Sequence, residues 1–133
     1  LKLKSMKTEK IILDTNFLIY CAKEKLDYVE EISKLINEDY ELVVPEKVIE
    51  ELERLKIKTK KEKDKTASDL AIQILKTNKI KKVNPGGETV DKSIINLSQE
   101  NKKNITATLD REMRQILGRV ILINRGKKLM LTK

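Results

Sequence analysis

The 133-residue sequence contains no histidine, a single cysteine (Cys21) and only 3% aromatic residues. Without imidazole, mechanisms that use histidine as a base are excluded, and so are classical zinc sites and disulfide frameworks. The scarcity of aromatic side chains argues against base stacking as the main binding device. Any chemistry must therefore use carboxylates, hydroxyls, lysine, arginine or a hard metal ion.

Long hydrophobic runs are also absent. No stretch approaches the ~18–20 apolar residues of a membrane span, and residues 1–10 have no apolar core of the signal-peptide kind. A lone cysteine suits a reducing compartment, so we expect a cytoplasmic protein. We expect residues 1–9 to form an N-terminal extension, with Met6 as a candidate start, and residues 10–133 to form a single domain.

Positive charge is abundant. Lysine and arginine number 29 against 21 acidic residues, which gives a formal net charge of +8. Such a surplus favours polyanionic partners, nucleic acid first and acidic membrane surfaces second, although lysines can also simply solvate a surface. Lysine is concentrated at positions 56–65, where a polar linker or a solvated helix end is expected.

Short apolar runs alternate with amphipathic segments along the chain. The apolar runs predict strands at 10–14, 41–44, 80–83, 105–109 and 119–124, and residues 129–131 can add a short edge strand. Helical spacing predicts helices at 15–25, 27–37, 46–56, 66–77 and 110–117, and another that starts after Thr89. This alternation predicts an α/β fold, a three-layer α/β/α sandwich with a central, mostly parallel sheet of about five strands.

Acids follow the predicted strands at the edge where parallel sheets bind ligands. Asp14 and Asp110 come after the first and fourth strands. Asp91 lies in the first turn of the helix after the third strand, and Glu51 lies one turn into the helix after the second. Taken singly, each Asp can be a helix cap and Glu51 an exposed helix acid. Taken together, converging carboxylates would repel one another without a cation, and Mg²⁺ or Mn²⁺ is the natural one.

Four segments around these acids resemble the motifs of PIN-domain ribonucleases. Residues 12–18 (ILDTNFL) are similar to the opening motif, and residues 44–55 (VPEKVIEELERL) to the second, in which the Glu before Leu is catalytic. Residues 90–94 (VDKSI) resemble the third motif and residues 106–113 (TATLDREM) the fourth. The ending, GRVILINR, is similar to archaeal PIN proteins related to rRNA-processing endonucleases. The family often has a second acid where Lys92 stands and Asn where Leu109 stands.

The resemblance implies a PIN-like fold and Mg²⁺- or Mn²⁺-dependent hydrolysis of RNA, with 5′-phosphate and 3′-hydroxyl ends on the products. It implies that the catalytic and metal-binding residues are Asp14, Glu51, Asp91 and Asp110. Hydroxyl or amide groups that support the site would come from Thr15, Asn16 and Thr108, for which helix capping is the alternative. Phosphates would be held, without reading of bases, by Lys56, Lys58, Lys60, Lys61, Arg111 and Arg114, the last two of which can also be a solvated helix face.

Other functions stay open from the sequence. A non-catalytic RNA-binding or ribosome-assembly module could use the same fold. Toxins of toxin–antitoxin pairs share this active site, so an antitoxin or a ribosome-assembly partner is a candidate beside RNA, while no membrane partner is expected. A homodimer could form through an apolar helix face and residues 129–131. A phosphoacceptor receiver or a haloacid-dehalogenase-type phosphatase fits poorly, because the phosphatase motif needs a second Asp where Asn16 stands.

Overall fold

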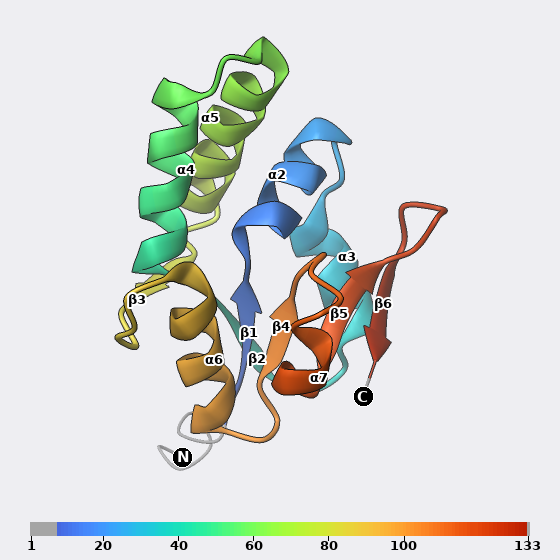
Figure 1. Cartoon of the computed structure of the whole chain (residues 1–133). Helices are drawn as coiled ribbons and strands as arrows, with labels where there is room; N and C mark the ends of the chain where they lie inside the picture. Colours follow the sequence, from blue (N-terminus) through green and yellow to red (C-terminus); the bar gives the residue numbers. More distant parts are fainter. Residues whose placement is uncertain (1–7, 133) are drawn as a thin grey trace.

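Strands are separated by one or two helices along most of the computed structural model, which describes residues 8–132 (Figure 1). The strands are β1 (Glu9–Leu13), β2 (Tyr40–Pro45), β3 (Lys81–Val83), β4 (Ile105–Ala107), β5 (Val120–Ile123) and β6 (Leu129–Thr132). The helices are α2 (Thr15–Lys23), α3 (Tyr28–Leu35), α4 (Glu46–Lys58), α5 (Glu62–Thr77), α6 (Val90–Glu100) and α7 (Arg114–Leu117). The predicted α/β class is confirmed.

The strands form one sheet in the order β3-β2-β1-β4-β5-β6. All neighbouring pairs are parallel except β5 and β6, which are antiparallel. The sheet exceeds the expected five strands because residues 129–132 do form the edge strand. The chain order reverses at β1, which lies between β2 and β4. The carboxyl ends of these three strands therefore surround the position where parallel sheets bind ligands.

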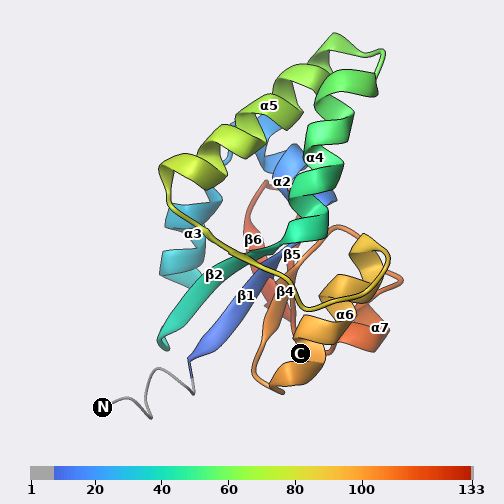
Figure 2. The ribbon, with the colours of Figure 1, turned by 90° about the vertical axis from the view of Figure 1, so that its left-hand side faces the viewer.

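Helices cover both faces of the sheet, as predicted. Alternate residues of a strand point to opposite faces, and on β1 Ile11 and Leu13 join a large buried cluster with side chains from α2, α3, α4 and α5. Ile12 joins a smaller cluster on the other face, with Ile94 from α6 and Leu117 from α7. Figures 1 and 2 agree that α3 lies on the opposite side of the sheet from α6 and α7.

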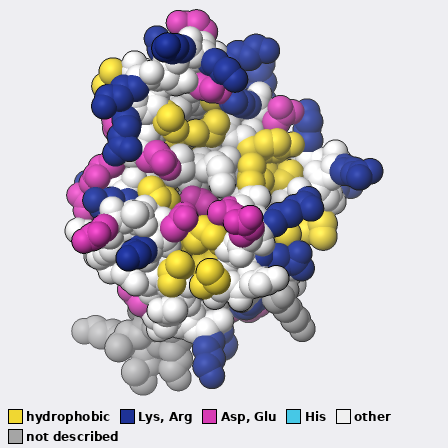
Figure 3. Space-filling view, viewed as in Figure 1, with side chains coloured by type: hydrophobic (Ala, Val, Ile, Leu, Met, Phe, Trp, Pro, Cys, Tyr) yellow, Lys and Arg dark blue, Asp and Glu magenta, His cyan; other side chains and the backbone are white. Residues whose placement is uncertain are grey.

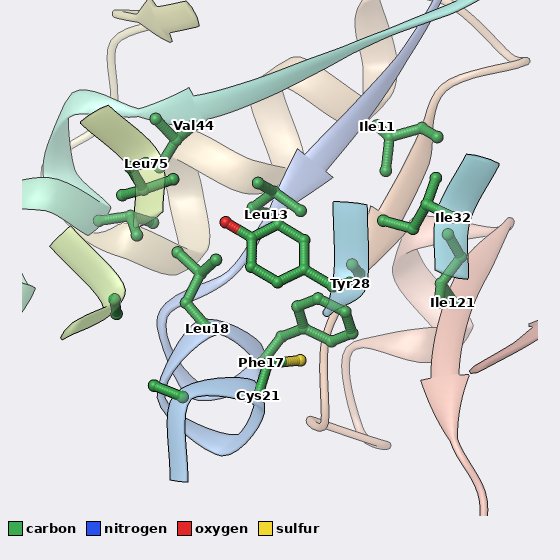
Figure 4. Packing of buried hydrophobic residues seen from close by; sticks show 14 of the residues in the cluster. Ile11, Leu13, Phe17, Leu18, Cys21, Tyr28, Ile32, Val44, Leu75 and Ile121 are labelled. Atoms are coloured by element: carbon green, nitrogen blue, oxygen red, sulfur yellow. The ribbon is translucent and has the colours of Figure 1, made fainter. Parts of the chain in front are cut away.

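The larger cluster holds the start of α2 against the sheet. Figure 4 shows Phe17 and Tyr28 packed together near Leu13. The two rings meet edge to face, with centroids 5.8 Å apart and planes at 72°, an arrangement that aromatic pairs prefer. Phe17 is fully buried and lies three residues after Asp14, so this packing fixes the end of β1 from which that acid projects.

Helices α4 and α5 lie side by side and extend beyond the carboxyl edge of the sheet (Figures 1 and 2). The pair α4 and α5 forms an arm, and we call residues 56–65, where the chain turns from α4 into α5, the arm tip. Both predicted alternatives, linker and solvated helix end, apply here: α4 ends at Lys58, and α5 begins at Glu62 rather than at the predicted residue 66. The negative charges of Glu62 and Asp64 in its first turn interact favourably with the positive end of the helix dipole and stabilise the start of α5. Asp64 also pairs with Lys23 of α2.

The helix predicted at 110–117 is also different in the structure, where only its second half is helical. One carboxylate oxygen of Asp110 accepts hydrogen bonds from the backbone N–H groups of Glu112 (3.0 Å) and Met113 (3.4 Å). These bonds hold residues 111–113 in a turn, so α7 begins only at Arg114.

Residues 1–7 of the expected N-terminal extension lie outside the described residues, and β1 begins at Glu9. In the segment expected to contact a second copy, Leu129 is buried in the core while Met130 is 43% exposed. No helix within residues 8–132 is long and apolar enough to cross a membrane.

Candidate active site

Asp14 is the most buried of the four predicted acids, with 4% of its surface exposed. It follows β1 directly, and its backbone N–H donates to the carbonyl of Ala107 at the end of β4 (3.0 Å). Its side chain caps α2, where Oδ1 accepts a hydrogen bond from the backbone N–H of Thr15 (2.7 Å). Oδ2 accepts a bond from the hydroxyl of Thr108 (2.6 Å). Both oxygens are therefore fixed at the junction of two neighbouring strands.

The environment of Asp14 disfavours its charge. Burial raises its pKa from 3.8 to about 6, although the hydrogen bonds from Thr108 and Thr15 act in the opposite direction. The negative charges of Asp91 and Glu51 also raise this pKa. Asp14 at the end of β1, Glu51 on α4 and Asp91 on α6 are therefore near enough to interact electrostatically.

Glu51 and Asp91 line one cavity of about 350 Å³ between α4 and the start of α6. Two further acids, Glu50 and Glu88, line it as well. On the face seen in Figure 3, acidic side chains gather near the middle, with apolar side chains above and below them. Four acids and two cations therefore line this cavity, whereas Asp14 and Asp110 are not among its lining residues.

The loop before α6 fixes the position of Asp91. Thr89 caps the helix with its side chain, as the sequence predicted. The hydroxyl of Ser93, which is buried, donates to the carbonyl of Gly86 (2.8 Å). Gly87 has a φ of +96°, and a Cβ at this position would lie 2.8 Å from the backbone nitrogen of Ser93. The loop is thus packed closely on the first helical turn, which carries Asp91.

Asp110 is linked to Asp14 through one hydroxyl group. The oxygen of Thr108 that donates to Asp14 also accepts the backbone N–H of Asp110 (3.0 Å). The Oδ1 atom of Asp110 holds the turn at residues 111–113. Its Oδ2 atom makes no hydrogen bond within residues 8–132, so one oxygen of this half-buried carboxylate remains available to a ligand.

The three predicted supporting residues lie beside these acids. Thr108 bonds to Asp14 directly, whereas Asn16 accepts the backbone N–H of Leu109 with its side-chain oxygen (3.1 Å) and so ties α2 to the loop after β4. Thr15 donates its backbone N–H to Asp14, while its hydroxyl oxygen is buried and has no partner in the described part of the chain. The position of Asp14 thus depends on the first turn of α2 and on the segment that follows β4.

The donor chemistry of the site fits a hard divalent ion. No group of three or more acidic side chains among residues 8–132 forms a ready-made metal cage. Mg²⁺ keeps several of its waters and needs only one or two carboxylates, and the pair Glu51 and Asp91 near Asp14 meets that need. Direct ligation by the predicted acids stays a prediction.

The predicted phosphate-binding residues lie on two sides of the site. Lys58, Lys60 and Lys61 are exposed at the arm tip and form no ion pair with a described residue, whereas Lys56 pairs with Asp69 (3.2 Å). Arg111 and Arg114 are exposed in the turn and helix that follow Asp110. Their contact with RNA stays a prediction.

Two cationic residues of the cavity were not predicted. Lys47 and Arg54 line it beside Glu51 and Asp91. The signal was present in the sequence, because positions 47, 51 and 54 share one face of a helix. The lysine-rich segment at 56–65 is the stronger cationic signal in the sequence, so these two residues were not among the predicted phosphate contacts.

Comparisons with known proteins agree with this fold and identify the family. A family model described as a PIN like domain matches residues 11–125. Ribonuclease VapC4 of Methanocaldococcus jannaschii is 39% identical over 109 residues, which are 81% of this chain and 82% of that protein. The solved structure of the PIN domain endonuclease Utp24 has a TM-score of 0.72 at 21% identity, over 90% of each chain, and this likeness concerns the fold. The chain therefore belongs to the PIN-domain ribonuclease family.

Proposed function

We propose that the chain is a divalent-metal-dependent endoribonuclease whose catalytic carboxylates are Asp14, Glu51, Asp91 and Asp110. The observation that carries this proposal is the buried Asp14 carboxylate, whose pKa is raised by burial and by the charges of Asp91 and Glu51. None of the four acids pairs with a lysine or arginine in the described part of the chain. A divalent cation would offset this concentration of negative charge.

The chain's own groups prepare the site for such an ion. Thr15 and Thr108 hold both oxygens of Asp14 in place, and the turn at 111–113 leaves Oδ2 of Asp110 available. Glu51 and Asp91 approach from the cavity side. When bound, Mg²⁺ or Mn²⁺ would polarise the phosphate and stabilise the charge that develops as the phosphodiester breaks. The lack of histidine leaves the carboxylates as the main acid–base groups of this site.

RNA would cross the carboxyl edge of the sheet, with basic side chains on both sides of the acids. The arm tip would contribute Lys58, Lys60 and Lys61, and the loop after β4 would contribute Arg111 and Arg114. Lys56 is already paired with Asp69 and would contribute less. These side chains bind the sugar–phosphate backbone without reading bases, in keeping with the 3% aromatic content.

Cleavage of a labelled RNA transcript by the purified chain tests the proposal. We expect cleavage with Mg²⁺ or Mn²⁺, none with EDTA, and products with 5′-phosphate and 3′-hydroxyl ends. Asp14→Asn and Glu51→Gln should each lower the rate by more than about 100-fold. Glu53→Gln is the matched control, because Glu53 is an exposed acid on the same helix as Glu51. Cleavage that survives EDTA or Asp14→Asn would contradict the proposal.

The same experiment separates the other functions considered for this fold. RNA that is bound but not cleaved under any metal condition would indicate a non-catalytic RNA-binding or ribosome-assembly module. For an active enzyme, a single cut in a ribosomal RNA precursor would indicate RNA maturation. Cleavage of many cellular RNAs, with growth arrest on expression, would indicate a toxin and an antitoxin partner.

A further inference from the structure

A cationic side chain projects into the acid-lined cavity from α4. Arg54 lines this cavity together with Glu51 and Asp91. It follows Glu51 by three residues, and side chains at this spacing lie on the same face of a helix. The guanidinium is also exposed to solvent. A ligand that enters the cavity can therefore meet the acids and this guanidinium together.

Arg54 forms no ion pair with any described residue, although acids surround it. Glu50 and Glu51 lie one turn before it on the same helix, and Glu88 and Asp91 line the same cavity. The other cation of the cavity behaves differently: Lys47 pairs with Glu50 (3.8 Å). The N–H donors of Arg54 thus remain available to an anion from outside the chain.

Phosphate is the anion that best matches this arrangement. A guanidinium presents N–H groups in a planar fork that suits two oxygens of one phosphate. The surrounding acids would repel a phosphate that had no cationic partner. Arg54 would supply such a cationic partner, so the guanidinium can hold the nucleic acid beside Glu51 and Asp91.

The same face of α4 continues toward the arm tip. Lys47, Arg54 and Lys58 are spaced by seven and four residues, so their side chains form one row along the helix. Arg54 and Lys58 are separated by about 6 Å along the helix axis. Neighbouring phosphates of an extended strand can therefore meet Arg54 and Lys58 in turn.

We propose that Arg54 binds the RNA phosphate next to Glu51 and Asp91, and that Arg54 and Lys58 guide the backbone from the cavity to the arm tip. This inference rests on the proposed nuclease function and specifies how the substrate is held.

The salt dependence of RNA binding tests the role of Arg54 without cleavage. Fluorescence anisotropy would measure the affinity of a labelled short oligouridylate, with every variant made in an Asp14→Asn background. Arg54→Gln should weaken binding about 10-fold and reduce the slope of log affinity against log salt by about 0.7, the value for one lost phosphate contact on a single strand. Arg54→Lys should keep most of the slope, because it keeps the charge.

Lys102→Gln is the control for a general loss of charge. Lys102 is exposed in the loop before β4, at the opposite edge of the sheet, and forms no ion pair among the described residues. It should leave the slope unchanged. An Arg54→Gln variant whose affinity and slope equal those of the Lys102→Gln control would overturn the proposal. Circular dichroism would establish that both variants are folded.

Cleavage then separates this proposal from the nuclease assignment. In the otherwise wild-type chain, Arg54→Gln should lower kcat/KM about 10-fold, and Arg54→Lys should restore part of it. If the wild-type chain cleaves RNA and Arg54→Gln changes neither kcat/KM nor the salt slope, the role of Arg54 is refuted while the nuclease stands. If the wild-type chain cleaves nothing but Arg54→Gln still reduces the slope, the nuclease fails and the phosphate contact stands.

Discussion

Thr108 donates a 2.6 Å hydrogen bond to Asp14 across 94 positions of sequence. Thr108 is fully buried and Asp14 nearly so, which shields the bond from water. The same hydroxyl oxygen accepts the backbone N–H of Asp110. One side chain therefore joins the carboxyl ends of β1 and β4 and sets the relative position of two candidate catalytic acids.

Removal of the Thr108 hydroxyl should impair the site without disturbing the core. Thr108→Val keeps the shape of the side chain but removes a bond that stabilises the ionised Asp14. We expect the pKa of Asp14 to rise further and the cleavage rate to fall about 10- to 100-fold. Thr108→Ser keeps the hydroxyl and should retain most activity. The measurement is the pH profile of RNA cleavage, and a Val variant with the wild-type rate and profile would refute the role of this bond.

The charge of Asp14 should destabilise the metal-free protein. Because the folded-state pKa is about 6 against 3.8 normally, the folded state binds more protons than the unfolded state between these values. The free energy of unfolding therefore decreases as the pH rises through this window. Asp14→Asn removes the charge, and we expect it to raise the free energy of unfolding by about 1–3 kcal/mol well above the raised pKa, with little change near the ordinary one.

Urea denaturation in EDTA, once near the ordinary pKa of Asp14 and once well above its raised pKa, measures this effect. Addition of Mg²⁺ should stabilise the wild-type chain but not Asp14→Asn, because a ligand that binds the folded state raises its stability. An Asp14→Asn variant that is less stable than the wild-type chain at the higher pH would contradict the view that burial disfavours the charge of Asp14.

Substitution of Gly87 should displace Asp91. Its φ of +96° disfavours a side chain, and a Cβ would clash with the backbone nitrogen of Ser93 at 2.8 Å. We expect Gly87→Ala to cost about 1–3 kcal/mol of stability and to lower the cleavage rate. Gly118 is a matched control, because its φ is also positive, at +79°, but its Cβ would meet nothing within 4 Å. Equal cleavage rates for Gly87→Ala and Gly118→Ala, each compared while folded, would argue against this loop as the support of Asp91.

The core contains a hydroxyl whose removal should stabilise the fold. Tyr28 is 1% exposed, and its hydroxyl has no hydrogen-bond partner in the described part of the chain. Tyr28→Phe removes this buried polar group and keeps the edge-to-face contact with Phe17. We expect the free energy of unfolding to rise by about 1 kcal/mol, measured by urea denaturation beside Tyr40→Phe, a half-buried control that should change little. A clear loss of stability in Tyr28→Phe would show that the hydroxyl has a partner.

The sequence was sufficient to predict most of the fold because short apolar runs and helical patterns are local signals. The strands were placed correctly to within about two residues, and Thr89 was identified as a cap. The errors arose at the starts of two helices, where an acidic side chain makes a hydrogen bond or an ion pair that the sequence pattern does not reveal. Asp110 replaces the first turn of α7 with a hydrogen-bonded turn. Asp64, paired with Lys23 of α2, lies in the first turn of α5, which begins four residues before the predicted start at residue 66.

The site could be predicted only in part, because its energetics depend on tertiary contacts. Sequence spacing placed Asp14 after a strand, but its burial and its bond to Thr108 appear only when β1 and β4 pair. The helical spacing of Glu51 and Arg54 is visible in the sequence, but only the packing of α4 near the start of α6 brings Arg54 into one cavity with Asp91.

Metal binding tests the central claim most directly. Calorimetric titration with Mn²⁺ would compare the wild-type chain with Asp14→Asn, Glu51→Gln, Asp91→Asn and Asp110→Asn. Glu53→Gln and Glu112→Gln are the controls, because these exposed acids lie beside Glu51 and Asp110 in sequence. We predict that each of the four substitutions weakens Mn²⁺ binding about 10-fold or more and that neither control does. A wild-type chain that binds no Mn²⁺, or affinities that are equal in all variants, would contradict the account.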